Sequence, residues 1–520
     1  MKFRIKFLSV LGLFLPALVF SANFIYRPVT ITPPEPPREF RGAWITEIAT
    51  NADWPSKPGL TVKEQKDELI ALLDRAVQLH LNAIILQVRP ECDAMYASPI
   101  EPWSEYLTGA MGRPPQPFYD PLAFAVEECH QRGLELHAWF NPFRALLAET
   151  RSPVAGNHIS RTHPEFTRKY GDLLWLDPGD PLVRQYVLSV VMDVVKRYDV
   201  DGVQFDDYFY PYPEKDPAGH ALDFPDYATW KKYGQGLDRD DWRRQNINLF
   251  IQSIYQNIKA AKPAVKFGVS PFGIWRPGFP KQIKGLDAYA NLYADTRKWL
   301  AEGWLDYFSP QLYWPIDDPP HSFPVLMQWW RGQNVKGRNL WPGLGAVNVG
   351  EKWKAVEIAR QIQAIRAQSD DGGEIFYHLR SVLDNQALAS SIRAEYAQPA
   401  LVPASPWLDA ATPDKPVLSM TIGNNSTVTA SWKSGGTPAR LWVLQCQATN
   451  KVWTTQILPA NQTSHVFAIS NLDIISICAV DRAGNLSAPA VLSPQMTQLI
   501  PPLQRRKGFE TLDWPPKKQN

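Results

Sequence analysis

The chain has 520 residues, of which 45% are hydrophobic and 20% charged, a composition typical of a globular protein with two or three domains. The formal net charge is only +2, which argues against nucleic acid as the main partner. Aromatic residues make up 12% of the chain and include 20 Trp. Flat rings suit carbohydrate faces, but Trp also fills protein cores, so composition alone does not decide between these uses.

The first 22 residues are typical of a secretory signal peptide. Lys2, Arg4 and Lys6 precede an apolar run over residues 7–20, and the small residues Ser21 and Ala22 follow it. Cleavage there would remove three positive charges and change the net charge from +2 to −1. Because no cysteine lies in this segment, a lipid on an N-terminal cysteine is excluded. We expect the protein in the periplasm or cell envelope, and at a membrane only if the segment stays uncleaved.

Composition changes divide the chain further. The expected segments are a signal peptide (1–22), a Pro-rich linker (23–38), a barrel (39–397), a second linker (398–416), a small β-sandwich (417–498) and a disordered basic tail (499–520).

Eight strand-like runs alternate with helical segments inside the barrel region. They are expected at 40–46, 83–89, 134–141, 202–207, 266–272, 306–314, 339–347 and 374–380. Thr61 and Glu64 form a capping box, and Asp120 and Asp180 each precede a proline at the start of a helix. This α/β pattern predicts a closed (β/α)8 TIM-type barrel. Long insertions at 90–119, 142–180 and 208–245 would build one side of a groove above its mouth.

Neither a cofactor nor a metal is expected. No Gly-rich phosphate loop follows the first strand, and the spacing of the four cysteines matches no metal motif.

Short alternating strands follow the second linker, at 428–432, 441–448, 452–458 and 474–480, and predict a β-sandwich. Residues 479–487 resemble the last hairpin of fibronectin type III modules. Cys446 and Cys478 fall within this module and are candidates for a disulfide. Our first interpretation of the module is a spacer, and the alternative is a contact for an envelope or division protein.

The run from Asp201 to Tyr208 is the most informative segment. Alternation places Val203 and Phe205 on one face of a strand and Gln204 and Asp206 on the other, so Asp206 should point into the barrel mouth. Applied to all strands, the same rule predicts a set of inward residues: Gln87, Arg89, His137, Trp139, Asn141, Gln204, Asp206, Ser270, Gln311, Tyr313, His378 and Arg380. Polar residues on the inward face of six strands indicate an active or binding site.

These residue types indicate sugar chemistry. Glycosidic cleavage normally uses two carboxyl groups, while amides and Arg hold hydroxyls and rings stack on sugar faces. Asp206 is the expected nucleophile or base, and Asp207 and Asp93 are the preferred second carboxylates, with Glu91 and Glu47 as alternatives. The alternative is that either Asp207 or Asp93 has a structural role and forms an ion pair with Arg89. The expected substrate-binding residues are Arg89, His137, Trp139, Asn141, Gln204, Tyr208, Gln311, Tyr313 and His378.

A series of short motifs in a fixed order carries a family resemblance. The motifs are Arg38–Trp44, Asp53–Pro55, Gln87–Pro90 with Asp93 and Tyr96, Trp139–Pro142, Asp201–Tyr208, Tyr293–Arg297 and Gly303–Trp314. Over residues 38–395 the chain resembles the bacterial glycosyl hydrolase-like 10 family, which includes the divisome-localised glycosyl hydrolase. The resemblance implies a barrel hydrolase of O-glycosyl bonds in cell-envelope polysaccharide, here peptidoglycan glycan strands stripped of stem peptides.

The resemblance also indicates the roles of individual residues. Members of this type are often lipoproteins, and this chain departs from them because it lacks the lipid-acceptor cysteine. The matched acidic positions are Asp93, Asp206, Asp207, Asp295 and Asp306, of which Asp306 opens a strand at the barrel bottom and should be structural. Glu47 and Glu91 occupy positions that vary in the family, which weakens their claim to catalysis.

Two other functions remain open at this point. One is hydrolysis of another exported polymer, such as an α-glucan or a capsule. The other is a catalytically silent scaffold that binds glycan and uses the C-terminal module as an adaptor.

Overall fold

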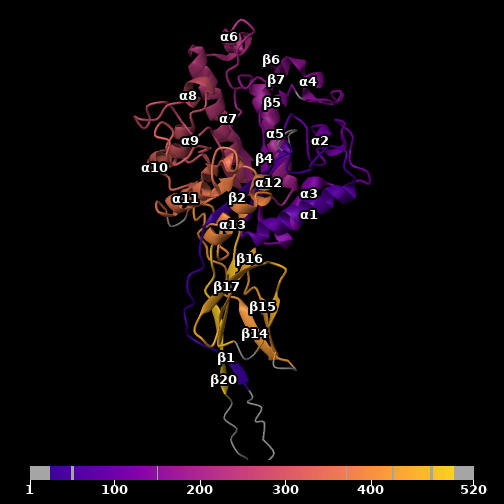
Figure 1. The fold of residues 1–520 in the computed structure, drawn as a ribbon. Helices are drawn as coiled ribbons and strands as arrows, with labels where there is room; N and C mark the ends of the chain where they lie inside the picture. The colour runs from indigo at the N-terminus through magenta and orange to yellow at the C-terminus, as the bar shows by residue number, and fades with distance from the viewer. Residues whose placement is uncertain are drawn as a thin grey trace, which may run out of the picture.

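The computed structural model describes residues 24–47, 52–148, 150–369, 372–423, 427–468 and 472–496. The expected signal peptide and basic tail lie outside these ranges. The described chain forms two parts, a ring of helices around a parallel sheet and an antiparallel β-sandwich at one end of it (Figure 1).

The parallel sheet closes into a barrel, as the sequence predicts. Its strands follow the order β11-β10-β9-β8-β4-β3-β2-β13-β12. β11 and β12 are two parts of one run, because Trp341 donates its backbone N–H to Phe308 on one side and Ile375 donates to Pro342 on the other. The strands are β2 (Phe40–Ile45), β3 (Ala83–Arg89), β4 (Glu135–Phe140), β8 (Gly202–Phe205), β9 (Lys266–Val269), β10 (Tyr307–Phe308), β11 (Asn339–Leu340), β12 (Gly343–Leu344) and β13 (Gly373–Phe376).

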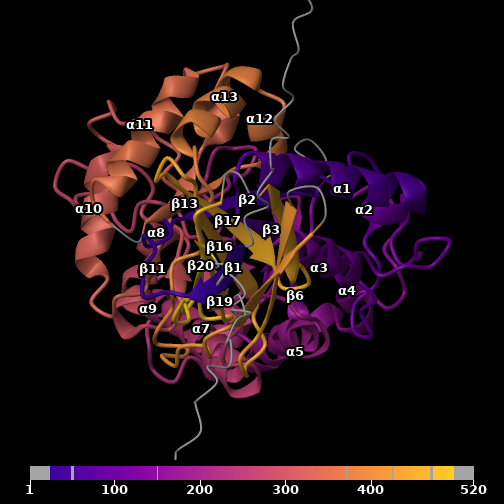
Figure 2. The ribbon, with the colours of Figure 1, turned by 90° about the horizontal axis from the view of Figure 1, so that it is seen from below.

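Helices surround the barrel, and their ends carry the predicted caps. Thr61 and Glu64 make the capping box of the first helix, and the side chains of Asp120 and Asp180 accept backbone N–H groups at the start of the next two. The ring consists of α1 (Val62–Gln78), α3 (Pro121–Gln131), α5 (Pro181–Arg197), α7 (Arg239–Ala261), α9 (Thr296–Glu302), α10 (Phe323–Gln333), α11 (Ala355–Arg366) and α13 (Gln386–Glu395). Figure 2 shows the ring from below.

Large side chains fill the lower barrel and require glycine beside them. The Phe40 and Trp341 rings stack with their centroids 3.8 Å apart. A Cβ on Gly202 would lie 2.4 Å from the ring of His137, and one on Gly268 would lie 2.0 Å from the ring of Tyr307. Glycine is therefore required in β8 and β9 so that these two rings fit between the strands.

The predicted insertions cover the other end of the barrel, where the strands finish. They contain the short helices α2 (Glu105–Thr108), α4 (Ile159–Thr162) and α6 (Tyr227–Tyr233) and a three-stranded antiparallel sheet. That sheet consists of β5 (Arg144–Leu146), β6 (Thr167–Tyr170) and β7 (Leu173–Leu176). Two further short helices, α8 (Ala288–Asn291) and α12 (Leu379–Leu383), follow β9 and β13. Figure 1 shows α4, α6 and β5–β7 at the end of the barrel opposite the sandwich.

The C-terminal part is a two-sheet β-sandwich, and it contains one strand that the sequence analysis assigned to a linker. Phe24–Pro28 forms β1, which pairs antiparallel with β20 (Ala490–Met496) over five residues of each strand. The prolines at 33, 34, 36 and 37, which follow this strand, made the whole segment resemble a linker. The other strands are β14 (Val417–Ile422), β15 (Thr427–Lys433), β16 (Leu441–Gln447), β17 (Trp453–Pro459), β18 (Ser464–Ala468) and β19 (Ile474–Val480). Identity with fibronectin type III modules stays a prediction.

The four cysteines are unpaired thiols, Cys446 and Cys478 included. Within the described ranges, none of the helices has the length and apolar character that a membrane crossing requires.

Asp201 joins the sandwich to the bottom of the barrel. It precedes β8, is 6% exposed, and accepts hydrogen bonds from the Leu136 backbone N–H and from the Arg440 guanidinium of the sandwich. His130 lies 2.9 Å from the same carboxylate. Burial alone would raise the pKa of Asp201, but the charge of Arg440 and the hydrogen bond from His130 lower it well below its usual range. The carboxylate therefore stays ionised between the two domains.

We expect Asp201→Ala to destabilise the protein by about 3 kcal/mol, because it leaves the charge of Arg440, whose side chain is only 14% exposed, without its ion-pair partner. Thermal and urea unfolding measure the loss. Asp199→Ala is the matched control, since Asp199 pairs with Arg482 at the same interface with a 63% exposed side chain and should cost less than about 1 kcal/mol. Equal losses in the two variants would contradict the role assigned to Asp201.

Candidate active site

Asp206 lies in the barrel mouth, held by donors from the neighbouring strand. Its Oδ2 accepts hydrogen bonds from Trp139 Nε1 and Asn141 Nδ2, each at 3.0 Å. Its Oδ1 accepts the backbone N–H of Tyr208 at 3.3 Å. β4 and β8 pair in register, with Trp139 opposite Gln204, so Trp139 and Asn141 reach the level of Asp206. The two strands therefore bring these predicted residues together.

Asp207 lies beside Asp206 because β8 ends at Phe205 and the chain turns. Its carboxylate accepts hydrogen bonds from the Tyr212 hydroxyl and from the Gln311 amide. The Gln311 amide also donates to the Ser270 backbone carbonyl at 2.9 Å. Asp207 and Gln311 thus lie in one group with Asp206.

Both carboxyl groups resist ionisation. Asp206 is 5% exposed and Asp207 is 3% exposed. Burial, followed by the charge of Asp207, raises the pKa of Asp206 to about 7. Burial likewise raises the pKa of Asp207, while its hydrogen bond from Tyr212 acts in the opposite direction. Two adjacent carboxyls with raised pKa values are expected to share a proton near neutral pH.

Arg144 is a site residue that the sequence analysis missed. It begins β5 in a long insertion, it is 5% exposed, and its Nε donates to the Pro90 carbonyl at 3.0 Å. Its positive charge lowers the pKa values of Asp206 and Asp207 against the effect of burial. Its guanidinium carbon lies 5.2 Å from the centroid of the Tyr208 ring. Its spacing from Asn141 in the Asn-Pro-Phe-Arg run was the available clue, since Asn141 Oδ1 accepts the Arg144 backbone N–H.

Tyrosine rings line the mouth beside the two aspartates. Tyr208 and Tyr212 lie edge to face with centroids 5.7 Å apart, and Tyr313 stacks on Tyr377 at 5.6 Å. All four rings are partly exposed. Tyr208 and Tyr313 were predicted here, whereas Tyr212 and Tyr377 were not.

Asp93 belongs to a second acidic group, not to the pair. Its Oδ1 accepts the Glu91 backbone N–H at 3.0 Å, and burial raises its pKa to about 8. Glu91 is bound by the hydroxyls of Thr150 and Tyr106. Glu47 is 1% exposed and lines a separate cavity of about 300 Å³ with Tyr106. The two acidic groups share Arg144 as a neighbour, since its charge lowers the pKa values of Glu47 and Glu91 as well as that of Asp206.

Arg89 is a structural residue in this arrangement. Its guanidinium is fully buried and binds both carboxylate oxygens of Glu101, at 2.6 and 2.8 Å. It also donates to the backbone carbonyls of Asn141 and Pro142. The expected ion pair with Asp93 or Asp207 is replaced by Glu101, which comes from the long loop after β3. Arg89 therefore supports the strand end that carries Asn141 and does not reach the mouth.

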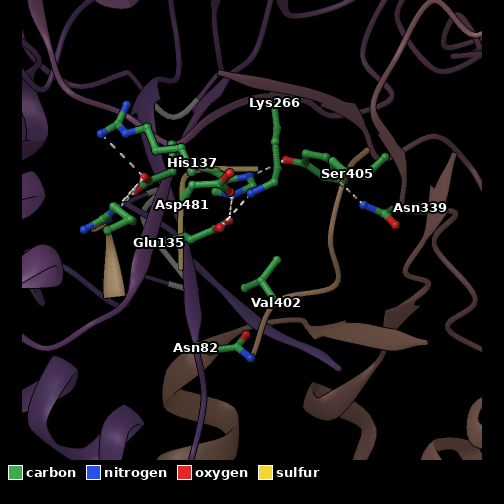
Figure 3. A network of polar contacts seen from close by, with 12 residues as sticks. Asn82, Glu135, His137, Lys266, Asn339, Val402, Ser405 and Asp481 are labelled. Carbon is green, nitrogen blue, oxygen red and sulfur yellow. Dashed lines mark hydrogen bonds and ion pairs between the residues drawn. The ribbon is translucent and has the colours of Figure 1, made fainter. Parts of the chain in front are cut away.

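His137 faces inward as predicted, but it lies at the bottom of the barrel. It pairs in register with Gly202, two residues below the level of Gln204. Its two ring nitrogens contact the Tyr307 hydroxyl at 2.8 Å and Glu135 at 3.0 Å. Figure 3 shows His137 with Glu135 and Lys266, whose ammonium binds Glu135 at 2.6 Å. This position corrects the expected sugar contact, because alternation gives the face of a strand and not the depth of a residue.

His378 corrects the predicted parity of the last strand. Ile375 pairs in β13 and packs inside the barrel with Tyr377 beside it, so the inward face continues to Tyr377 and not to His378. His378 follows the strand, and its ring contacts Asp53 at 2.6 Å. Arg380 donates its backbone N–H to the same carboxylate. The two predicted residues hold the loop after β2 against the start of α12.

Polar atoms beneath the pair lack partners among the described residues. They are Gln87 Nε2 and Ser270 Oγ, and both residues are at most 2% exposed. Gln204 Oε1 accepts the indole N–H of Trp44. Asp306 behaves as predicted and is structural, since it accepts the Phe267 backbone N–H and the Trp407 indole N–H. In the described ranges, no group of three His, Cys, Asp or Glu side chains is placed to hold a metal ion.

The sequence of this chain is similar to those of known glycosyl hydrolases. The family profile described as Glycosyl hydrolase-like 10 matches residues 39–359. Glycosyl hydrolase YngK of Bacillus subtilis (strain 168) is 42% identical over 427 residues, which cover 79% of this chain and 80% of that protein. Glycosyl hydrolase DigH of Escherichia coli (strain K12) is 37% identical over 356 residues, which cover 62% of this chain and 79% of that protein.

Among solved structures, the glycoside hydrolase domain of PgaB (BpsB) from Bordetella bronchiseptica superposes with a TM-score of 0.45 at 14% identity. The match covers 69% of this chain and 98% of that domain.

We expect Asp206→Asn to raise the melting temperature at pH 8 by a few degrees. The folded pKa of about 7 lies above the value of about 4 in an unfolded chain, so burying the ionised group costs stability that is fully felt above pH 7 and vanishes below about pH 4. The gain from Asn should therefore shrink at pH 5. Scanning calorimetry at both pH values measures it.

Asp226→Asn is the control for the opposite sign, because Asp226 is buried in an ion pair with Arg243 at 2.6 Å. It should lower the melting temperature at both pH values. Destabilisation by Asp206→Asn at pH 8 would contradict the expected cost of burying the ionised Asp206 carboxylate.

Proposed function

The chain belongs to the glycosyl hydrolase-like 10 family, and from this premise we propose that it is an exported glycoside hydrolase acting on peptidoglycan glycan strands that carry no stem peptides. The pair of buried carboxyl groups at the end of β8 is the observation that carries the proposal. Asp206 and Asp207 lie at the mouth of a barrel, where enzymes of this fold place their chemistry. A carboxyl with a pKa near 7 suits a proton donor to the leaving oxygen of a glycosidic bond.

The surroundings of the pair support a sugar polymer as substrate. Tyrosine rings flank the carboxyls, and the mouth is bordered by the insertions after β3, β4 and β8. Rings of this kind stack on pyranose faces, and amides such as Asn141 and Gln311 bind hydroxyls. Envelope location rests on the hydrophobic segment at residues 7–20 and on the family resemblance. A contact of the sandwich with an envelope or division protein stays a prediction.

The direct test uses residues 23–520 and purified glycan strands from which the stem peptides have been removed by an amidase. We expect the wild type to release soluble disaccharide-containing fragments and Asp206→Asn to be slower by at least about 100-fold, the contribution of a general acid. Liquid chromatography with mass spectrometry measures the products.

The same assay decides between the alternatives. No release from these strands but release from an exported α-glucan or a capsule would replace the proposed substrate. No release from any glycan, with equal retention of strands by the wild type and Asp206→Asn in a pull-down, would identify a binding scaffold.

The pH profile should follow the proton on the pair. A donor works only while it holds its proton, and the protonated form of Asp206 is lost as pH rises through about 7. We therefore expect kcat/KM to fall between about pH 7 and 9, by about tenfold per pH unit once the proton is lost. Initial rates on soluble glycan fragments measure this, and a profile that stays flat to pH 9 would exclude Asp206 as the group that carries the shared proton.

A further inference from the structure

We propose that Asp206 and Asp207 act together on a sugar that bears a 2-acetamido group, and that the acetamido oxygen of the substrate is the nucleophile. This inference rests on the proposed glycosidase function and adds the substituent that the enzyme requires and the way in which the bond is broken.

The first argument is the position of the two carboxyls. Glycosidases with two catalytic carboxylates place them on opposite faces of the sugar, roughly 5 to 9.5 Å apart. Asp206 and Asp207 are consecutive residues at the end of one strand, and they share Arg144 and Tyr212 as neighbours. Both therefore approach a bound sugar from the same side. In that position one carboxyl can protonate the leaving oxygen, but the other cannot attack the opposite face of the ring.

The second argument is the rest of the mouth. Tyr377, which follows β13, and Tyr313, which follows β10, line another side of the mouth. Neither residue can serve as a carboxylate nucleophile. Within the described part of the chain, the other acidic group consists of Glu47, Glu91 and Asp93. Glu91 and Asp93 are bound to protein donors, and the residues that line the cavity of Glu47 include neither aspartate of the pair. The nucleophile is then best supplied by the substrate.

The third argument is that buried polar atoms near the pair have no hydrogen-bond partner among the described residues. Gln87 on β3 is 1% exposed and has no partner for its Nε2 among the described residues. Ser270, directly after β9, is in the same condition. Buried polar groups are normally hydrogen-bonded, so these atoms indicate a polar group or a water that completes the site. An acetamido group presents both an N–H and a carbonyl oxygen to such a surface.

The reaction balances with the one proton that the pair shares. The acetamido oxygen forms a bond to the anomeric carbon as the glycosidic C–O bond breaks. The protonated aspartate gives its proton to the leaving oxygen, and the ionised aspartate takes the acetamido N–H proton, which leaves a neutral oxazoline. Water then attacks the anomeric carbon as the bond from that carbon to the acetamido oxygen breaks. The water passes a proton to the aspartate that first acted as acid, while the other aspartate returns its proton to the nitrogen and so restores the acetamido group. The anomeric configuration is retained.

The first experiment compares three preparations of the same denuded glycan strands: untreated, chemically N-deacetylated, and N-deacetylated then re-acetylated. We expect deacetylation to slow cleavage by about 100-fold or more and re-acetylation to restore it, because the amide oxygen that attacks is removed and returned. Untreated strands that are not cleaved at all would count against the proposed function. Untreated and deacetylated strands that are cleaved equally fast would overturn the inference alone.

A second experiment separates chemistry from binding. Strands re-acylated with trifluoroacetyl groups keep the N–H and carbonyl but carry a less nucleophilic oxygen. Their kcat should fall by about tenfold or more with KM changed little, because only the barrier to attack rises. Proton NMR of fresh product should show retained configuration. Inverted product, or a covalent sugar adduct on the protein after treatment with a 2-deoxy-2-fluoro glycoside, would overturn the inference.

Variants complete the test. Asp206→Asn and Asp207→Asn should each lose activity on untreated strands by about 100-fold or more. Glu374→Gln is the matched control, since burial also raises the pKa of Glu374, to about 8, but it lies near the opposite end of the barrel, in hydrogen-bond contact with Tyr396. It should keep activity within about twofold, well under the tenfold that 1.4 kcal/mol represents. Full activity of either aspartate variant would contradict the shared role of the pair.

Discussion

The burial of two adjacent carboxyl groups is the constraint on which the mouth of this barrel depends. Taking a carboxylate out of water is costly unless donors or an opposite charge replace the lost solvent. Trp139 and Asn141 supply donors to Asp206, Tyr212 supplies one to Asp207, and Arg144 supplies the charge. Trp139 and Asn141 come from the end of β4, whereas Tyr212 and Arg144 come from two different insertions. The side chains around the mouth therefore form a shell that replaces the solvent lost by the two buried carboxyl groups.

That shell is held in place by residues that never reach the mouth. Arg89 binds Glu101, Cys92 and the backbone carbonyls of Asn141 and Pro142, which fixes the end of β4. Asp53 joins the loop after β2 to the start of α12. Such buried, fully paired charges are sensitive to single substitutions, because removing one partner leaves the other uncompensated. Loss of activity after mutation at these positions would report on support of the site and not on contact with substrate.

The sequence predicted the barrel well because alternation and caps are local properties. Strand positions, the capping box at Thr61 and the inward direction of Asp206 all follow from neighbouring residues. Depth was not predictable, and so His137 was expected at the mouth although it packs at the level of Gly202. The end of the last strand was not predictable either, which reversed the parity of His378. Arg144, Glu101 and β1 escaped because long insertions and distant pairings bring them into place.

The pairing of β1 with β20 determines how the molecule responds to force. Phe24 lies opposite Met496, at the end of the sandwich farthest from the barrel, so both ends of the described chain leave from one place (Figure 1). Tension between the barrel and anything attached upstream of residue 24 would pull β1 along its partner and load all of its ladder hydrogen bonds at once. The mouth, at the other end of the molecule, would stay outside the path of that load. A load applied at residue 24 therefore enters the molecule at the end opposite its mouth.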